Sequence, residues 1–242
     1  MSLIATLFVR EGIVMAADSR LTINTHEQQG DSSIVHLAVG QSDSTYKVFL
    51  APHDIGVSTC GDADIQGVPI AGYVDSFITA SLQDRPSSVE EVARKVLEHF
   101  GAFDPVPNTQ FHVAGYSEVD GTLEQQVWAV EVTAKKLTRL NVPGQQGASW
   151  AGEGDILARL IQPVAQIDEN DGIIQKFPSP QIPWQFFTLQ DAIDFAVFAI
   201  RSTIDALRFQ PRPKSVGGPV DVLVIKPSGA VWIQRKELHV DR

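Results

Sequence analysis

The chain has 242 residues, of which 43% are hydrophobic and 20% charged, which is ordinary for a globular protein with an apolar core. Its formal net charge is −10, and no basic cluster interrupts that balance, so a nucleic-acid-binding role is disfavoured. Because Cys60 is the only cysteine, the chain forms no internal disulfide. Together with the lack of a signal peptide at 1–10 and of an apolar run of about 20 residues, this predicts a cytoplasmic protein outside the membrane.

The first quarter of the chain predicts strands. Residues 3–9 and 13–17 are apolar runs joined by a short turn, which is typical of a hairpin. The polar segment 22–44 predicts a long loop or an extended hairpin. Further strands are expected at 46–51 and 55–60, separated by a proline-containing turn.

Two helices are predicted next. Apolar residues recur with a largely helical spacing over 63–82, although Gly67 and Pro69 leave open a helix that begins only after them. The second helix is expected from a cap at Ser87 or Ser88 to about Phe100, with acidic residues in its first turn.

The second half repeats this order of strands, helices and strands. We expect strands at 111–116, 125–133 and 137–141, a helix at 155–164, an irregular proline-rich stretch at 168–188, a helix at 189–207, and strands at 220–225 and 231–235. Clustered strands with paired helices predict an α+β fold, a four-layer αββα sandwich of two stacked antiparallel sheets covered by helices. No repeat or linker divides residues 1–242, so a single domain is predicted.

Ser2 is the first candidate nucleophile. A seryl hydroxyl attacks a carbonyl only when a base accepts its proton. An α-amino group has a pKa of about 7.7–8.0, closer to neutral than a lysine amine at about 10.4. If Met1 is removed, as is usual before a small residue, the amine of Ser2 can be that base, directly or through a water. A Met-Ser start is common, however, so alone it identifies no enzyme.

Three further residues gain a chemical role only in combination. Asp18 follows an apolar strand, where a carboxylate is usually a turn former or helix cap. Lys47 opens the next strand pair, and such a lysine commonly extends its charge into water. Paired with a buried Asp18, it would instead hold positive charge beside a nucleophile and lower the pKa of the hydroxyl. Gly61 can offer its backbone N–H to an oxyanion, or simply form a turn.

Residues 12–22 (Gly-Ile-Val-Met-Ala-Ala-Asp-Ser-Arg-Leu-Thr) resemble the first hairpin of proteasome β-subunits, Gly-hydrophobic-Ala-Ala-Asp-Ser-Arg-x-Thr. The spacing from Lys47 to Gly61 is similar to that between the catalytic lysine and the oxyanion glycine of that family. Residues 151–155 and 216–218 look like its glycine-containing turns near the active site. The chain thus resembles the bacterial proteasome-type N-terminal-nucleophile (Ntn) hydrolases, most strongly over residues 2–64.

This resemblance implies roles for individual residues. Ser2 stands where the family has its N-terminal threonine, Asp18 on the catalytic aspartate, Lys47 on the catalytic lysine and Gly61 on the oxyanion glycine. Thr22 stands on the threonine that binds the substrate backbone. The pocket beside the nucleophile would be lined by Leu21, Thr45, Phe49, Thr59 and Ala63, a mixture that favours a medium-sized apolar side chain before the scissile bond.

The chain also departs from the family pattern. Serine lacks the methyl group that orients the threonine side chain, so a slower enzyme is expected. Glu153 and Val216 stand where the family has two serines around the amine. Its second aspartate has no clear counterpart, since Asp205 and Asp221 both qualify. Glu153 and Asp205 are therefore accessory candidates only.

The predicted function is amide or peptide-bond hydrolysis through an acyl-enzyme on Ser2, without a cofactor and with a peptide or protein substrate. Two alternatives remain open. One is an amidase or acylase that acts on a small molecule, in which the segments 22–44 and 168–188 would change the shape of the entrance to the active site. The other is a non-catalytic scaffold like the proteasome's α-type subunits, although those carry an extension before the first strand.

The resemblance also implies a homo-oligomer, with a ring possible and any ATPase partner unknown. A metal site is not predicted, because the six histidines show neither an HExxH motif nor paired spacing.

Overall fold

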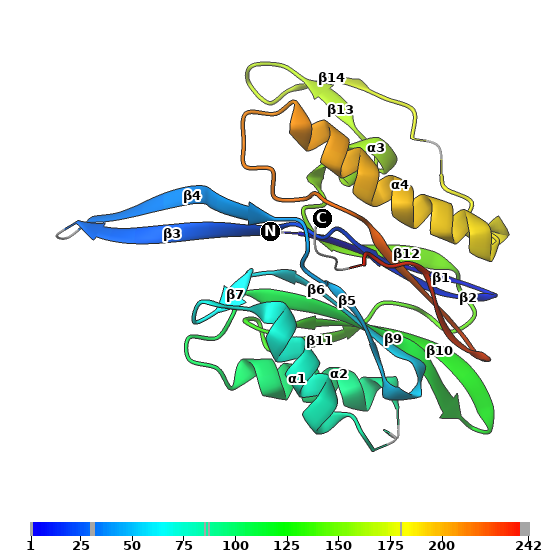
Figure 1. Ribbon diagram of the computed structural model, residues 1–242. Helices are drawn as coiled ribbons and strands as arrows, with labels where there is room; N and C mark the ends of the chain where they lie inside the picture. The colour runs from blue at the N-terminus through cyan, green and yellow to red at the C-terminus, as the bar shows by residue number, and fades with distance from the viewer. Residues whose placement is uncertain (1, 30–31, 85, 87, 180, 238–242) are drawn as a thin grey trace.

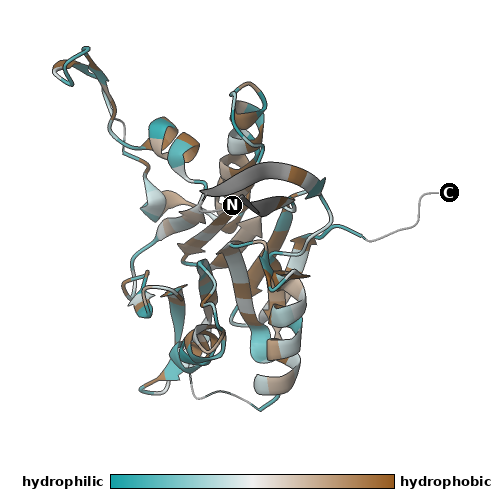
Figure 2. Cartoon of the chain, turned by 90° about the vertical axis from the view of Figure 1, so that its left-hand side faces the viewer, coloured by the Kyte–Doolittle hydropathy of each residue, from teal (hydrophilic) through white to brown (hydrophobic). Residues whose placement is uncertain are grey.

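The computed structural model describes residues 2–29, 32–84, 86, 88–179 and 181–237. Two five-stranded antiparallel sheets form its centre, and helices lie on their outer faces (Figure 1). The apolar residues gather on the strands in the middle of the molecule (Figure 2). The predicted combination of helices with antiparallel sheets is therefore confirmed.

The first sheet carries the start of the chain. Its strands in spatial order are β12 (Gly147–Gly152), β1 (Leu3–Val9), β2 (Gly12–Ala17), β15 (Asp221–Lys226) and β16 (Gly229–Gln234). Every residue of β1 and β2 is buried, because one face packs on helix α4 (Leu189–Arg208) and the other on the second sheet. Burial on both faces explains the continuous apolar runs of these strands.

The second sheet carries the strands that end near Ser2. Its strands in spatial order are β11 (Lys136–Arg139), β10 (Thr122–Glu131), β9 (Thr109–Val119), β6 (Ile55–Gly61) and β5 (Val48–Ala51). A short 3-10 turn, Pro52–Asp54, joins β5 to β6. Ile4 and Met15 of the first sheet share a core with Val48 and Ala114 of the second, so the two sheets pack face to face.

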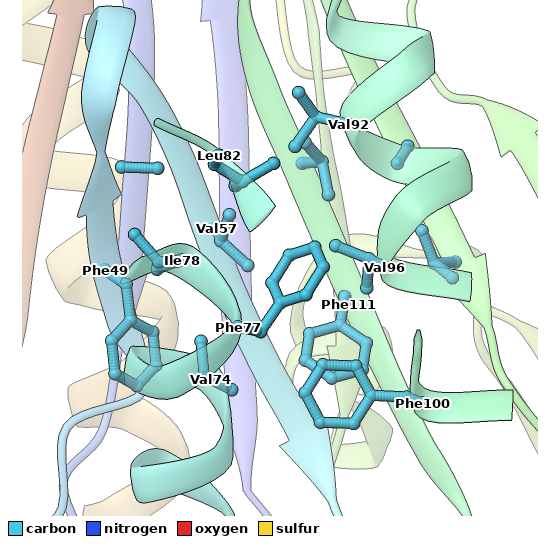
Figure 3. Close-up of a cluster of buried hydrophobic side chains, with 14 of the residues drawn as sticks. Phe49, Val57, Val74, Phe77, Ile78, Leu82, Val92, Val96, Phe100 and Phe111 are labelled. Carbon is cyan, nitrogen blue, oxygen red and sulfur yellow. The ribbon is translucent and has the colours of Figure 1, made fainter. Parts of the chain in front are cut away.

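Helices α1 (Ile70–Ser81) and α2 (Val89–Gly101) cover the outer face of the second sheet. Figure 3 shows Phe77 and Phe100 pointing from these helices toward Phe111 of β9. The side chain of Ser88 accepts a hydrogen bond from the N–H of Glu91, which confirms the predicted cap and satisfies a free donor of the first turn.

Three antiparallel hairpins lie outside the large sheets. They are β3 (Leu21–Gln29) with β4 (Ser32–Ser42), β7 (Asp64–Ile65) with β8 (Val68–Pro69), and β13 (Ala165–Ile167) with β14 (Ile173–Lys176). The segment 22–44 is thus an extended hairpin and not a loop, and it projects away from the body beside the N-terminus (Figure 1).

The structure differs from the sequence-based expectations at several elements. The helix expected over 63–82 begins at Ile70, because the hairpin β7–β8 occupies the residues before it. The helix expected over 155–164 is α3 (Asp155–Ile161), which stops sooner. The stretch 168–188 contains β14 and a 3-10 turn, Trp184–Phe186. Strand β12 was not predicted at all. Among the described residues, no helix is long and apolar enough to cross a membrane.

Candidate active site

Ser2 is fixed through its backbone just before β1. Its carbonyl oxygen accepts a hydrogen bond from the N–H of Glu153 at 2.8 Å, and the N–H of Leu3 donates to Asp18 Oδ1 at 3.1 Å. Gly152 lets the turn after β12 approach this closely: its φ is 92°, and a Cβ there would lie 1.9 Å from the carbonyl oxygen of Ser2. Ser2 is only 7% exposed, so its position is tightly defined.

Asp18 and Lys47 form a buried ion pair. Lys47 Nζ lies 2.9 Å from Asp18 Oδ1, and the two side chains are 5% and 0% exposed. Asp18 Oδ2 also accepts from the N–H groups of Arg20 and Gly217, each at 3.0 Å. Lys47 Nζ further donates to the carbonyl oxygen of Arg20 at 2.6 Å. With Leu3 included, four donors converge on one carboxylate, which holds the lysine in a single position.

The burial of this pair changes the proton affinity of the groups around it. Burial lowers the pKa of Lys47 from its ordinary value, and the negative charge of Asp18 opposes that change. Burial raises the pKa of the neighbouring Cys60 thiol to about 12. Cys60 is therefore a neutral thiol at physiological pH and a poor nucleophile.

A second, more exposed ion pair, Arg20–Asp43, lies at the edge of the site, where Arg20 lines the same cavity as Ser2. Arg20 Nε lies 2.7 Å from Asp43 Oδ1, and a second hydrogen bond joins Arg20 to Asp43 Oδ2 at 2.7 Å. The hydrogen bond to Asp43 raises the pKa of Arg20, and the same bond lowers the pKa of Asp43. The guanidinium lies against Gly217, where a Cβ would come within 2.3 Å of it. Glycine at 217 therefore lets the Arg20 side chain cover the loop that binds Asp18.

Ser2 and Lys47 line the same small cavity, and Asp18 lies behind Lys47. The other lining residues come from the base of the β3–β4 hairpin, the end of β6 and the start of α1: Arg20, Leu21, Thr22, Thr45, Thr59, Cys60, Gly61, Asp62, Ala63 and Ile70. The cavity volume is about 10 Å³, which is room for roughly one water. The hydroxyls of Thr22 and Thr59 are buried here without a hydrogen-bond partner.

Gly61 ends β6 with a φ of 115°, a conformation that side chains rarely adopt. A Cβ at this position would lie 2.3 Å from the carbonyl oxygen of Asn108. The close approach of this neighbouring segment therefore requires glycine here, independently of any role in binding an oxyanion.

Several predicted residues lie elsewhere. Phe49 does not line the cavity, because α1 covers its face of the sheet and buries it beside Val74 and Ile78 (Figure 3). Asp205 is exposed on α4 and does not line the cavity; it lines a separate pocket with Gly218 and Gln234. Val216 is part of the core beneath α4.

Glu153 is buried and compensated by partners that the sequence did not indicate. Its Oε1 accepts from Arg212 at 2.8 Å, and its Oε2 accepts from the hydroxyl of Ser215 at 3.0 Å. Arg212 also contacts Asp155 at 3.1 Å. These contacts join the loop before β15 to the turn that holds the carbonyl of Ser2.

The described residues contain no group of three or more histidine, cysteine, aspartate or glutamate side chains able to hold a metal. Met1, His239 and the side chains of His26 and His36 lie outside the described residues.

The two stacked sheets with helices on their outer faces form a proteasome-like fold. No family model matches the sequence, and no curated protein matches it. Among solved structures, Anbu from Hyphomicrobium sp. strain MC1 matches with a TM-score of 0.55 and 13% identity over 97% of this chain and 88% of that one. A Gly-1 mutant of Anbu from the same strain gives 0.60 and 14% over 98% and 86%. Anbu from Yersinia bercovieri, described as an ancestral β-subunit, gives 0.54 and 15% over 96% and 86%.

These comparisons correct the assignment made from the sequence motifs. The residues of 12–22 resemble proteasome β-subunits, but the likeness that the whole chain supports is to the fold of Anbu. At 13–15% identity and without a matching family model, it does not place the chain in the bacterial proteasome-type Ntn hydrolases.

Proposed function

We propose that the chain is an amide hydrolase whose nucleophile is the hydroxyl of Ser2, acting once Ser2 is the first residue. The observation that carries the proposal is that Ser2, Lys47 and Gly61 line one cavity, with the Lys47–Asp18 ion pair buried at its wall. Peptides are the substrates that this arrangement favours, because a groove adjoins the cavity and shares three residues with it.

The first half-reaction forms an acyl-enzyme. Ser2 Oγ attacks the amide carbon, and the α-amine of Ser2 accepts the hydroxyl proton. The carbonyl oxygen becomes an oxyanion at the N–H of Gly61. When the carbon–nitrogen bond breaks, the proton passes from the amine to the leaving nitrogen, and an ester on Ser2 remains.

The second half-reaction releases the product. A water molecule gives a proton to the same amine and attacks the ester carbon, and the proton returns to Ser2 Oγ as the ester bond breaks. The ammonium of Lys47 favours the unprotonated amine and the negative charge that develops on Ser2 Oγ. Asp18, held by four donors, keeps Lys47 in place. Space for about one water beside Ser2 supports a proton transfer relayed by water.

A non-catalytic scaffold is the second candidate, and the small cavity favours it. A volume of about 10 Å³ admits no side chain of a substrate. Turnover therefore requires the residues around Thr22 and Ala63 to separate when a peptide enters from the groove.

The deciding experiment compares two forms of the protein. The first is fused at its N-terminus to a removable tag, so that the amine of Ser2 is blocked, and the second is the same protein after cleavage before Ser2. Each is treated with an epoxyketone-type or serine-reactive acylating probe and examined by intact mass and peptide mapping. One adduct on Ser2 is expected in the cleaved form alone. It should be absent from Ser2→Ala and retained in the control Ser228→Ala, whose serine is exposed in the turn between β15 and β16. A cleaved protein that forms no adduct would leave the scaffold as the conclusion.

The proposal extends to the full layering and to assembly. The contacts of α4 with the first sheet and of α2 with the second sheet support a four-layer αββα arrangement. Exposed aromatic residues on and beside α4, Phe198 at 44% and Phe209 at 81%, support a homo-oligomer that packs through its outer helices. Light scattering after size-exclusion chromatography tests this, and a monomer at all concentrations contradicts it.

A further inference from the structure

A groove of about 370 Å³ adjoins the cavity at Ser2. The hairpin β7–β8 and the segment between α2 and β9 form its walls, and it shares Thr22, Asp62 and Ala63 with the cavity. A peptide that reaches Ser2 along this side of the molecule lies in the groove.

Two carboxylates line this groove. Asp62 Oδ2 accepts from the N–H of Asn108 at 2.7 Å, and Asp64 Oδ2 accepts from the N–H of Gly67 at 2.8 Å. These single hydrogen bonds orient the carboxylates and leave the other oxygen of each available. Both residues are exposed, and neither takes part in an ion pair within the described part of the chain. The nearby cations are already paired, Lys47 with Asp18 and Arg20 with Asp43.

The hydroxyl of Thr22 is an independent sign of a ligand. Thr22 is 6% exposed, its Oγ1 has no hydrogen-bond partner, and the residue lines both the groove and the cavity. Buried polar atoms in folded proteins almost always have a partner. A polar group of a bound main chain at this point would supply the missing one.

The remaining wall is apolar. Pro105, Val106 and Pro107 lie along it, and Val106 is 36% exposed. A long side chain with an aliphatic stem and a cationic end fits such a groove, since the stem covers the apolar wall while the cation reaches the carboxylates.

We propose that this groove selects peptides with a lysine or arginine side chain, whose cation binds to Asp62 and Asp64 while the main chain bonds to Thr22. The inference rests on the proposed function of Ser2 for its consequence in catalysis, but the binding itself does not require a reaction. Because the carboxylates are exposed, their effect should weaken as salt is added.

The first test measures binding without chemistry. Fluorescence anisotropy of labelled peptides with Ser2→Ala compares three sequences that differ only in lysine, norleucine or glutamate at one position. The lysine peptide should bind about tenfold more tightly than the norleucine peptide at low salt, which is about 0.7 kcal/mol from each carboxylate. The ratio should fall to about one in Asp62→Asn/Asp64→Asn, and remain in the control Asp84→Asn, whose carboxylate lies outside the groove. Equal affinities for lysine and norleucine overturn the inference.

The second test separates this inference from the proposed function. The ratio of kcat/KM for the same lysine and norleucine peptides is measured with protein whose first residue is Ser2. Turnover of both peptides at equal rates overturns the inference alone. Tight binding of the lysine peptide to protein that forms no adduct at Ser2 overturns the proposed function and upholds the groove.

Discussion

The molecule contains two buried lysine–aspartate pairs that look alike in composition and differ in their surroundings. Lys47 and Asp18 are 5% and 0% exposed, and Lys236 and Asp221 are 5% and 1% exposed. Burial lowers the pKa of both lysines. The Lys236 ammonium lies directly on Asp221 and 4.4 Å from the ring centre of Tyr46.

The difference lies in what each pair touches. Lys47 lines the cavity at Ser2, and its aspartate is held by backbone donors from separate parts of the chain. Asp221 accepts only from the ammonium and the N–H of Lys236, the latter at 2.8 Å, among the contacts that the structure describes. The first pair therefore lies at the proposed site, whereas the second joins the segment after β16 to the sheet. Burial and charge alone do not distinguish these two pairs.

The largest effect is expected from Lys47→Met. Loss of the ammonium beside Ser2 removes the charge that favours the neutral amine and the developing alkoxide, so turnover should fall at least about 10³-fold. Asp18 keeps its three backbone donors, which limits the loss of stability. Peptide hydrolysis and the rate of probe addition to Ser2 measure the change.

Circular dichroism and a urea titration show whether Lys47→Met is folded. A folded variant with full activity would contradict the assigned role. Lys47→Arg serves as the matched variant, since it keeps the charge but not the geometry, and it should recover only part of the rate.

Lys236→Met should have the opposite effect to Lys47→Met, with a large loss of stability and little change in turnover. It leaves the carboxylate of Asp221 buried with one backbone donor, which should cost about 3–5 kcal/mol in the free energy of unfolding. Turnover per folded molecule should stay within about threefold of the wild type, because Lys236 does not line the cavity. Urea midpoints and kcat are measured on the same preparations. The double variant Asp221→Asn/Lys236→Met should recover much of the stability, and a loss of activity equal to that of Lys47→Met would refute the comparison.

His112 is a buried titratable group with no ion-pair partner among the described residues, and we expect it to make the stability of the protein depend on pH. His112 is 2% exposed and shares a hydrogen bond of 2.9 Å with Thr6 across the two sheets. Burial lowers its pKa to about 4, below the value of about 6.5 in an unfolded chain. Between these values the unfolded state binds more protons, so stability should fall as the pH drops from about 6.5 to about 4 and level off below that.

The full size of this effect is roughly 3 kcal/mol. It is measured as the difference in unfolding free energy between the wild type and His112→Gln at pH 7 and pH 4, so that the carboxylates common to both cancel. A difference that does not change with pH would mean that the pKa of His112 is the same in the folded and unfolded states, and would contradict this prediction.

The fold was predictable where burial leaves a continuous apolar run, as in residues 3–9, or a helical period, as in the helix that begins at Leu189. Prediction failed where turn chemistry or tertiary pairing decides. Gln66 and Gly67 adopt positive φ angles of 53° and 79° and turn the chain into the hairpin β7–β8 before α1 begins. Residues 147–152 lie at a sheet edge, are small apart from Trp150, and are half-buried except for Gly152, so they show no alternation that would indicate a strand.

The site was predictable to the extent that its residues follow a motif. Ser2, Asp18, Lys47 and Gly61 were named from the resemblance to proteasome β-subunits, and their roles stay predictions. Contacts across long stretches of sequence were not predictable. The hydrogen bond from Ser215 to Glu153 spans 62 residues, and that from Arg20 to Asp43 spans 23. No local sequence pattern indicates which side chains will pair over such separations.

The smallest effect is expected from Asp43→Asn. This variant tests whether the exposure of an ion pair determines how much the pair contributes to the free energy of unfolding. The side chains of Arg20 and Asp43 are 20% and 42% exposed, so water screens their attraction even though the contact is doubly hydrogen-bonded. The loss in unfolding free energy should be below about 1 kcal/mol and should shrink as salt is added, unlike that of Lys236→Met. Urea titrations of both variants at low and high salt give the comparison. A loss of several kcal/mol for Asp43→Asn would show that the Arg20 cover over Gly217 organises the Asp18 loop, and that burial is the wrong measure of what an ion pair contributes here.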